Sequence, residues 1–148
     1  MNQEFDAIVI GTGISGGWAA KELCEAGLKT LVLERGRMIK HIVDYHTANM
    51  DPWDFKGGDK TTHEIEKKQY KQIRSTRYAV HESTSHFFVD DNEHPYNEDK
   101  PFDWVRGYHV GGKSLMWARQ VYRLSEFDFE ANAKEGIAVD WPIRYKDL

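Results

Sequence analysis

A glycine-rich stretch near the start of the chain and one acid beyond it are the residues best suited to chemistry. The stretch runs Gly11-Thr12-Gly13-Ile14-Ser15-Gly16, and Glu34 follows at about the 20-residue spacing of a dinucleotide fingerprint. Gly11 permits a tight turn, Gly13 lets the backbone approach a pyrophosphate without a Cβ, and Gly16 lets a helix pack close to a strand. The carboxylate of Glu34 would accept hydrogen bonds from a ribose diol and repel a 2′-phosphate, which disfavours NADP. The pattern predicts a dinucleotide site and leaves NAD and FAD both open.

These residues need a strand before the turn and a helix after it. Residues 5–10 are typical of a strand covered on both faces, as in a parallel sheet. Residues 15–26 have helical spacing with Gly27 at the expected C-cap, and residues 29–34 predict a second buried strand. Cys24, on this helix, is expected to be a small buried packing residue. The amide groups and the positive dipole end at the helix start would face the phosphates.

Three segments resemble one enzyme family. Glu34-Arg35-Gly36 is similar to the end of the first βαβ unit in FAD-dependent oxidoreductases. Residues 106–117 resemble the second FAD-contacting segment of the glucose-methanol-choline (GMC) oxidoreductases, and residues 140–148 resemble the family's Trp-Pro-Ile segment. The resemblance is closest to the subgroup of pyranose oxidase and gluconate dehydrogenase-like flavoproteins. It implies FAD as the cofactor.

In that family a Gly-Gly-x-Ser stretch lies against the pyrophosphate and the flavin, a role that the resemblance carries to Gly111, Gly112 and Ser114. Without side chains, the two glycines would let backbone N–H groups meet an anion or a ring edge. By the same resemblance, Trp117 is expected close to the flavin. Some members attach the flavin through a histidine just before this tryptophan. Here that position is Met116, which implies non-covalent FAD.

The predicted cofactor-binding residues are Gly11, Thr12, Gly13, Ile14, Ser15, Gly16, Glu34, Arg35, Val110, Gly111, Gly112, Ser114 and Trp117. No catalytic residue is assigned, because the family's catalytic histidine lies near the C-terminus of chains several times longer. We therefore expect residues 1–148 to be the N-terminal portion of an FAD-binding domain, without the substrate domain. Its class would be α/β, with a Rossmann-type βαβ unit followed by an irregular segment of helix and short strands. Such a domain is incomplete, because two strands alone leave sheet edges uncovered.

The activity that the resemblance implies is oxidation of an alcohol group on a sugar, polyol or sugar acid, with hydride transfer to the flavin. Two alternatives stay open. One is a non-catalytic or truncated nucleotide-binding module that awaits a completing subunit. The other is a fragment of an NAD-dependent dehydrogenase. The electron acceptor is not indicated.

Composition argues against several other classes. A length of 148 residues suits about one domain, and a net charge of −4 provides no cationic field for nucleic acid. The single cysteine excludes an intrachain disulfide and a cysteine-rich zinc site. No stretch approaches the roughly 18 apolar residues of a membrane helix, and the acidic N-terminus is unlike a secretory signal. We therefore expect a soluble, cytoplasmic chain without a membrane segment.

The middle of the chain carries weaker signals. Residues 63–77 predict a helix with a charged, solvated face, and residues 78–81 and 86–89 predict short strands. Residues 90–95 predict a solvated hairpin turn and do not fit a calcium loop. The histidines lack the spacing of a metal site, so no metal is predicted. His109 is more simply a neighbour of the cofactor segment than a catalytic base.

Overall fold

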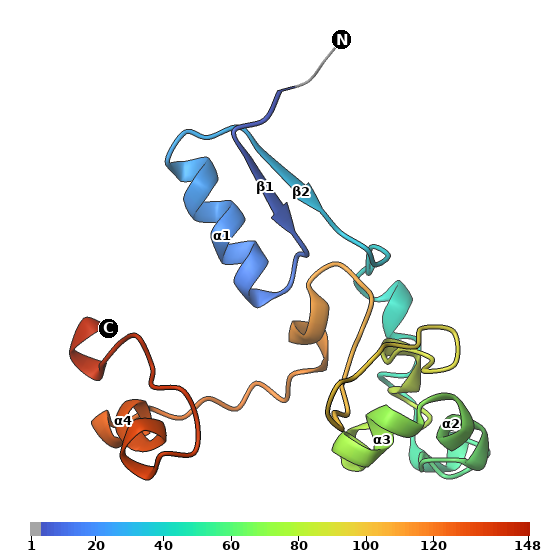
Figure 1. The fold of residues 1–148 in the computed structure, drawn as a ribbon. Helices are drawn as coiled ribbons and strands as arrows, with labels where there is room; N and C mark the ends of the chain where they lie inside the picture. Colours follow the sequence, from blue (N-terminus) through green and yellow to red (C-terminus); the bar gives the residue numbers. More distant parts are fainter. Residues whose placement is uncertain (1–3) are drawn as a thin grey trace. The chain divides into compact units, whose positions relative to one another are not determined.

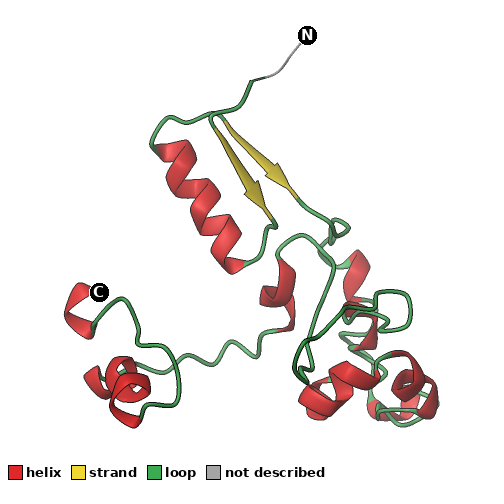
Figure 2. Ribbon diagram, viewed as in Figure 1, coloured by secondary structure: helices red, strands yellow, loops and turns green. Residues whose placement is uncertain are grey.

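The computed structural model describes residues 4–148. The chain forms two compact units, one ending at Met116 and the other spanning Trp117–Leu148 (Figure 1). The architecture is α/β, with a small two-stranded parallel sheet, several helices and long irregular segments (Figure 2). Within residues 4–148, no helix has the length and apolar character needed to cross a membrane.

The first unit begins with the predicted strand–helix–strand order. β1 (Ala7–Ile10) pairs in parallel with β2 (Thr30–Leu33), and α1 (Ile14–Glu25) connects them. Aliphatic and β-branched side chains suit both strands. Gly27 follows the helix with a φ of +85°, a conformation in which a Cβ would be strained. The predicted glycine stop is therefore confirmed.

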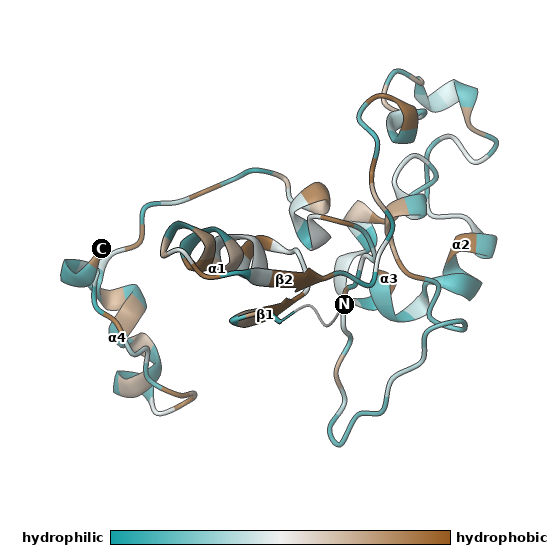
Figure 3. Ribbon diagram, turned by 90° about the horizontal axis from the view of Figure 1, so that it is seen from above, coloured by the Kyte–Doolittle hydropathy of each residue, from teal (hydrophilic) through white to brown (hydrophobic). Residues whose placement is uncertain are grey.

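The strands are not covered on both faces, so that prediction is wrong. Val9 is buried and its side chain lies beside Gly16 of α1, whereas Ile8 and Ile10 are 60% and 84% exposed. Alternate side chains of a strand point to opposite faces, and α1 packs on the Val9 face. Figure 3 shows that both strands are strongly hydrophobic. Cys24 is exposed, so the prediction of a buried packing residue is wrong; α1 is described in full and has no buried residue.

After β2 the first unit continues through short helices. They are η1 (Val43–Tyr45), η2 (Pro52–Asp54), α2 (His63–Lys68), α3 (Tyr70–Thr76), η3 (Arg77–Ala79), η4 (Ser85–Phe87) and η5 (Gly112–Met116), where η marks a 3-10 helix. The single helix predicted over residues 63–77 is broken at Gln69, whose φ of −124° is not helical. The buried Gln69 amide donates to the carbonyls of Ser85 and Phe88 at 2.8 and 3.0 Å. This side chain ties the break to the following segment.

Residues 78–81 and 86–89 do not form strands, so that prediction is also wrong. The first segment begins in η3 and the second in η4. The Thr84 hydroxyl donates to the carbonyl of Ala79 at 2.6 Å. Side chains thus occupy backbone acceptors that a sheet ladder would use. Val80 is fully buried between these turns and gives the segment its apolar, strand-like character.

A buried polar cluster lies in the core of this unit. Gln72, Asp91 and Arg106 are 0%, 2% and 4% exposed. Gln72 donates to Asp91 at 2.7 Å, the Arg106 guanidinium pairs with Asp91 at 3.2 Å, and the Arg106 backbone N–H donates to Gln72 at 2.8 Å. The solvated turn predicted over residues 90–95 is therefore wrong at Asp91. Its carboxylate is buried because the arginine and the amide compensate its charge.

The second unit consists of α4 (Glu126–Glu135), η6 (Tyr145–Asp147) and the segments around them. Gly136 ends α4 in the left-handed conformation. Phe129 of α4 is buried, and its ring lies 6.2 Å from that of Trp141 in an edge-to-face arrangement. The aromatic pair holds the C-terminal segment of this unit against its helix.

Candidate functional site: the glycine turn before α1

The turn between β1 and α1 has the backbone geometry that its glycines predict. Gly11 has a φ of +90°, and its N–H donates to the carbonyl of Leu33 at 2.7 Å. A Cβ on Gly16 would lie 2.0 Å from the Gly11 carbonyl oxygen, so the predicted close packing of the helix is confirmed. A Cβ on Gly13 would meet no atom within 4 Å. Gly13 therefore borders open space on the side where a ligand would approach.

A shallow groove of about 240 Å³ lies along the start of α1. Its lining includes Thr12, Gly13, Trp18, Lys21 and Ser114. The helix begins at Ile14 with Gly13 as its N-cap, and no side chain of residues 4–148 accepts a capping hydrogen bond there. The free N–H groups of the first-turn amides form the positive end of the helix dipole, where an anion is stabilised. The groove therefore has the chemistry of an anion site.

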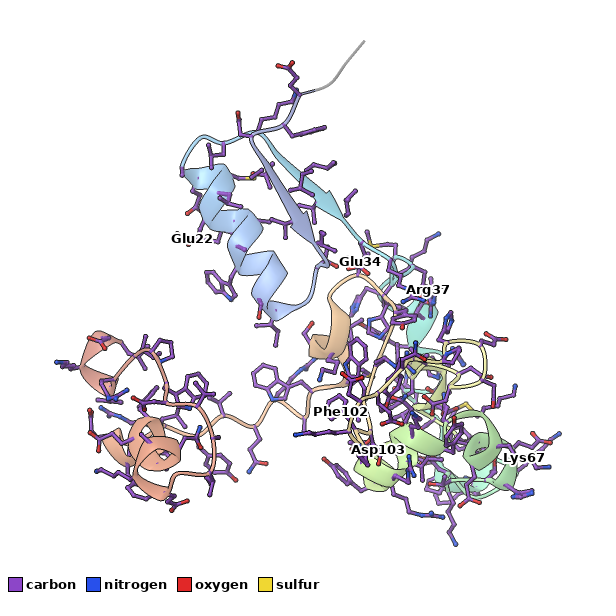
Figure 4. All side chains as sticks on the ribbon, in the orientation of Figure 1. Glu22, Glu34, Arg37, Lys67, Phe102 and Asp103 are labelled. Carbon is purple, nitrogen blue, oxygen red and sulfur yellow. The ribbon has the colours of Figure 1, made fainter. Side chains whose placement is uncertain are left out.

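Glu34, at the end of β2, turns its carboxylate back toward this turn (Figure 4). Its Oε2 accepts from the backbone N–H of Thr12 at 2.7 Å and from the Thr12 hydroxyl, and its Oε1 accepts from the N–H of Gly36 at 2.7 Å. These bonds lower the pKa of Glu34 below its ordinary value of 4.5, and the Thr12 hydroxyl is the largest cause. A carboxylate has about four lone-pair positions. The three bonds from Thr12 and Gly36 take three of them, so among the bonds of residues 4–148 one position on Oε1 is left, which suits one ligand hydroxyl rather than the two of a diol.

The second glycine-rich segment lies against Gly36 and Arg37, which follow β2. The backbone N–H of Val110 donates to the carbonyl of Arg37 at 2.9 Å. A Cβ on Gly36 would lie 2.1 Å from the backbone nitrogen of His109, so only glycine permits this approach. The N–H of Gly111 donates to the Thr12 hydroxyl at 3.1 Å. Two segments that are 99 residues apart therefore meet at the turn.

Gly112 and Ser114 follow this meeting point. A Cβ on Gly112 would lie 3.1 Å from the Cα of Gly13, and Gly112 has a φ of +54°. The Ser114 hydroxyl donates to the carbonyl of Gly111, while Ser114 also lines the groove. The structure therefore gathers the first-turn residues, Glu34 and the second glycine pair around one groove. Their role as cofactor contacts stays a prediction.

Arg35 and Trp117 are the two predicted cofactor contacts that the contacts above do not include. The guanidinium of Arg35 lies 4.0 Å from the centre of the Tyr108 ring and 3.4 Å from Nδ1 of His94. It is thus engaged by the protein's own aromatic residues. Trp117 is the first residue of the second unit. Its expected place beside a flavin stays a prediction.

Two features of the surroundings have no signal in the sequence. The buried cluster of Gln72, Asp91 and Arg106 fixes the irregular segment that leads to the second glycine pair. The rings of His46 and His86 lie with their centres 4.7 Å apart and tilted by 41° to each other, although the residues are distant in the chain. Among the residues that the structure describes, no group of three or more histidine, cysteine or acidic side chains is arranged to hold a metal ion.

The residues present fit the diphosphate of a dinucleotide. Open space at Gly13, uncapped amides and one free carboxylate position match a diphosphate and an adjacent ribose. The groove is below the roughly 300 Å³ at which ligand pockets begin. The described residues thus offer a place for one end of a dinucleotide.

No family model matches the chain. The chain is similar to the gluconate 2-dehydrogenase flavoprotein of Pantoea cypripedii, with 29% identity over 99% of this chain and 23% of that protein. It is also similar to the fructose dehydrogenase large subunit of Gluconobacter japonicus, with 26% identity over 97% of this chain and 25% of that protein. A shorter match, 61% identical over 33 residues, covers 22% of this chain and 7% of the pseudooxynicotine dehydrogenase of a Pseudomonas species. The chain spans about a quarter of the length of the first two relatives.

Proposed function

We propose that this chain holds the adenosine diphosphate part of FAD in a flavin-linked oxidoreductase of the GMC type. The observation that carries the proposal is the convergence of the α1 turn, Glu34 and the second glycine pair on one groove. Similarity to dehydrogenases, one of them named as a flavoprotein, supports a flavin over NAD. The names of two relatives, for gluconate and fructose, favour a sugar or sugar acid as the alcohol substrate.

Each residue has a specific part in this proposal. The first-turn amides of α1 bind the diphosphate beside Gly13. Oε1 of Glu34 accepts from one hydroxyl of the adenosine ribose. Gly111 and Gly112 let the second segment approach the diphosphate from the flavin side. When bound, the flavin would supply the acceptor for the hydride of the alcohol carbon, and no residue of this chain is assigned as the base for the hydroxyl proton.

Substitution at Gly13 tests the proposal. Gly13 has an ordinary φ of −65° and open space at its Cβ, so Gly13→Val keeps the turn and fills the groove. The weaker N-cap costs about 1 kcal/mol at most. We expect the Kd for FAD to rise at least about tenfold, measured by quenching of flavin fluorescence. Ala19→Val, at an exposed position of the same helix, should leave the Kd unchanged.

Competing nucleotides identify which part of FAD is recognised. ADP should displace FAD, and FMN, which lacks the adenosine, should bind poorly. The helical circular dichroism of each variant confirms that it is folded. A chain that binds NAD in preference to FAD, that binds neither dinucleotide, or that keeps its FAD affinity in Gly13→Val would contradict the proposal.

A further inference from the structure

Thr12 is hydrogen-bonded to two distant segments at once. Its backbone N–H and its hydroxyl both donate to Oε2 of Glu34, the first at 2.7 Å. The same hydroxyl oxygen accepts from the N–H of Gly111 at 3.1 Å. The α1 turn, the end of β2 and the second glycine pair are thus joined through one side chain.

The direction of each bond is determined by the chemistry of the partners. An ionised carboxylate only accepts, so the Thr12 hydroxyl must turn its proton toward Glu34. Its lone pairs then face the N–H of Gly111, which only donates. Successive bonds of this kind polarise and strengthen one another. A hydroxyl at position 12 fits both neighbours, whereas a methyl group of the same size fits neither.

We propose that Thr12 is a positioning residue that sets both cofactor segments before FAD binds. By holding Oε2 of Glu34, it turns the open position of Oε1 toward the ribose. By holding Gly111, it keeps the second glycine pair beside the diphosphate groove. The inference rests on the proposed function and adds a role for the Thr12 side chain that a glycine-turn motif does not require.

The test compares Thr12→Val with Thr12→Ser in the full chain. Valine keeps the shape and places a methyl group against the carboxylate, and serine restores the hydroxyl. Without FAD, we expect amide hydrogen exchange at Gly111 to accelerate about tenfold in Thr12→Val and to stay near wild type in Thr12→Ser. Thr12→Ala, which introduces no new methyl contact, should repeat the acceleration if valine impairs folding.

FAD titrations give the second readout. The Kd should rise about tenfold in Thr12→Val and less than about twofold in Thr12→Ser. Because the Thr12 hydroxyl lowers the pKa of Glu34, the loss of FAD affinity on acidification should move to higher pH in Thr12→Val. A purely structural role for Thr12 would leave that pH profile in place.

The two proposals fail in different ways. Unchanged exchange at Gly111 in both Thr12→Val and Thr12→Ala would overturn the role of Thr12, whatever FAD does. An unshifted pH profile in Thr12→Val would also overturn it. If the wild-type chain binds no FAD while exchange at Gly111 responds as expected, the proposed function fails and the link through Thr12 stands.

Discussion

His109 is buried and His86 is half-buried, and the pKa values of both lie below the ordinary 6.5, chiefly because burial disfavours the charged ring. His109 is 3% exposed, and neither of its ring nitrogens has a hydrogen-bond partner among the described residues. As pH falls below 6.5, the unfolded chain takes up protons at these positions and the folded chain resists them. The free energy of unfolding must therefore decrease with falling pH in this window. The pKa values of Glu34 and Asp59 are also lowered. These two carboxylates reduce the free energy of unfolding only when the pH falls below about 4.5.

His109→Phe isolates this effect. In the wild-type chain, each histidine contributes at most about 1.4 kcal/mol of lost stability per pH unit below 6.5. The variant removes one titrating ring and keeps the edge-to-face neighbour Phe87 in contact. We expect urea unfolding at about pH 7.5 and about pH 5 to show a smaller loss for the variant. Equal losses for both proteins would rule out His109 as a source of the pH dependence.

At the scale of elements, two adjacent glycines of α1 have opposite effects on the stability of the helix. Gly16 lies so close to the turn that a Cβ would overlap the Gly11 carbonyl oxygen at 2.0 Å. Gly17 has open space at its Cβ and lies inside the helix, where glycine costs about 1 kcal/mol relative to alanine. The first glycine is required by packing, and the second only weakens the helix.

Alanine at each position separates these roles. Gly16→Ala should destabilise the chain by about 3 kcal/mol, because a backbone atom must move. Gly17→Ala should stabilise it by about 1 kcal/mol. The midpoint of urea unfolding, followed by helical circular dichroism, measures both. Equal effects at the two positions would show that α1 does not pack against the turn as described.

At the scale of the molecule, the first unit exposes one face of its sheet. Ile8 and Ile10 point away from α1 and are largely solvent-exposed, whereas Val9 on the other face is buried. Adjacent exposed aliphatic side chains of this kind promote self-association and bind apolar dyes. The same face contributes little to the stability of the chain, because its side chains stay in water.

The double variant Ile8→Thr/Ile10→Thr tests this division of the sheet. Threonine keeps the β-branched shape, so stability should change by less than about 1 kcal/mol while dye binding and self-association decrease. Val9→Ala, on the packed face, should instead cost about 2 kcal/mol. Dye fluorescence, sedimentation and urea unfolding give the three measurements. A large stability loss in the threonine variant would mean that another part of the protein covers this face.

Local signals were sufficient for the βαβ segment. The strands, the helix and the glycine stop at Gly27 follow from residue type and spacing over short distances, and the close approach at Gly16 follows from the turn. The same signals failed for residues 78–81 and 86–89. There, side chains such as Thr84 bind the backbone and replace the ladder of a strand. Strand propensity alone does not report such competition.

Sequence alone thus identified the glycine turn and its acid, since both depend on spacing within one local unit. Tertiary structure was needed to bring Gly111 to Thr12 and to bury Asp91 with Arg106. These contacts join residues far apart in the chain, and no local pattern encodes them. The tertiary structure also determined which donors the Glu34 carboxylate binds. The spacing predicts an acceptor for a diol, but Thr12 and Gly36 already occupy most of its lone pairs. Folding satisfies a partly buried acceptor such as Glu34 with whatever donors the packed chain brings within reach.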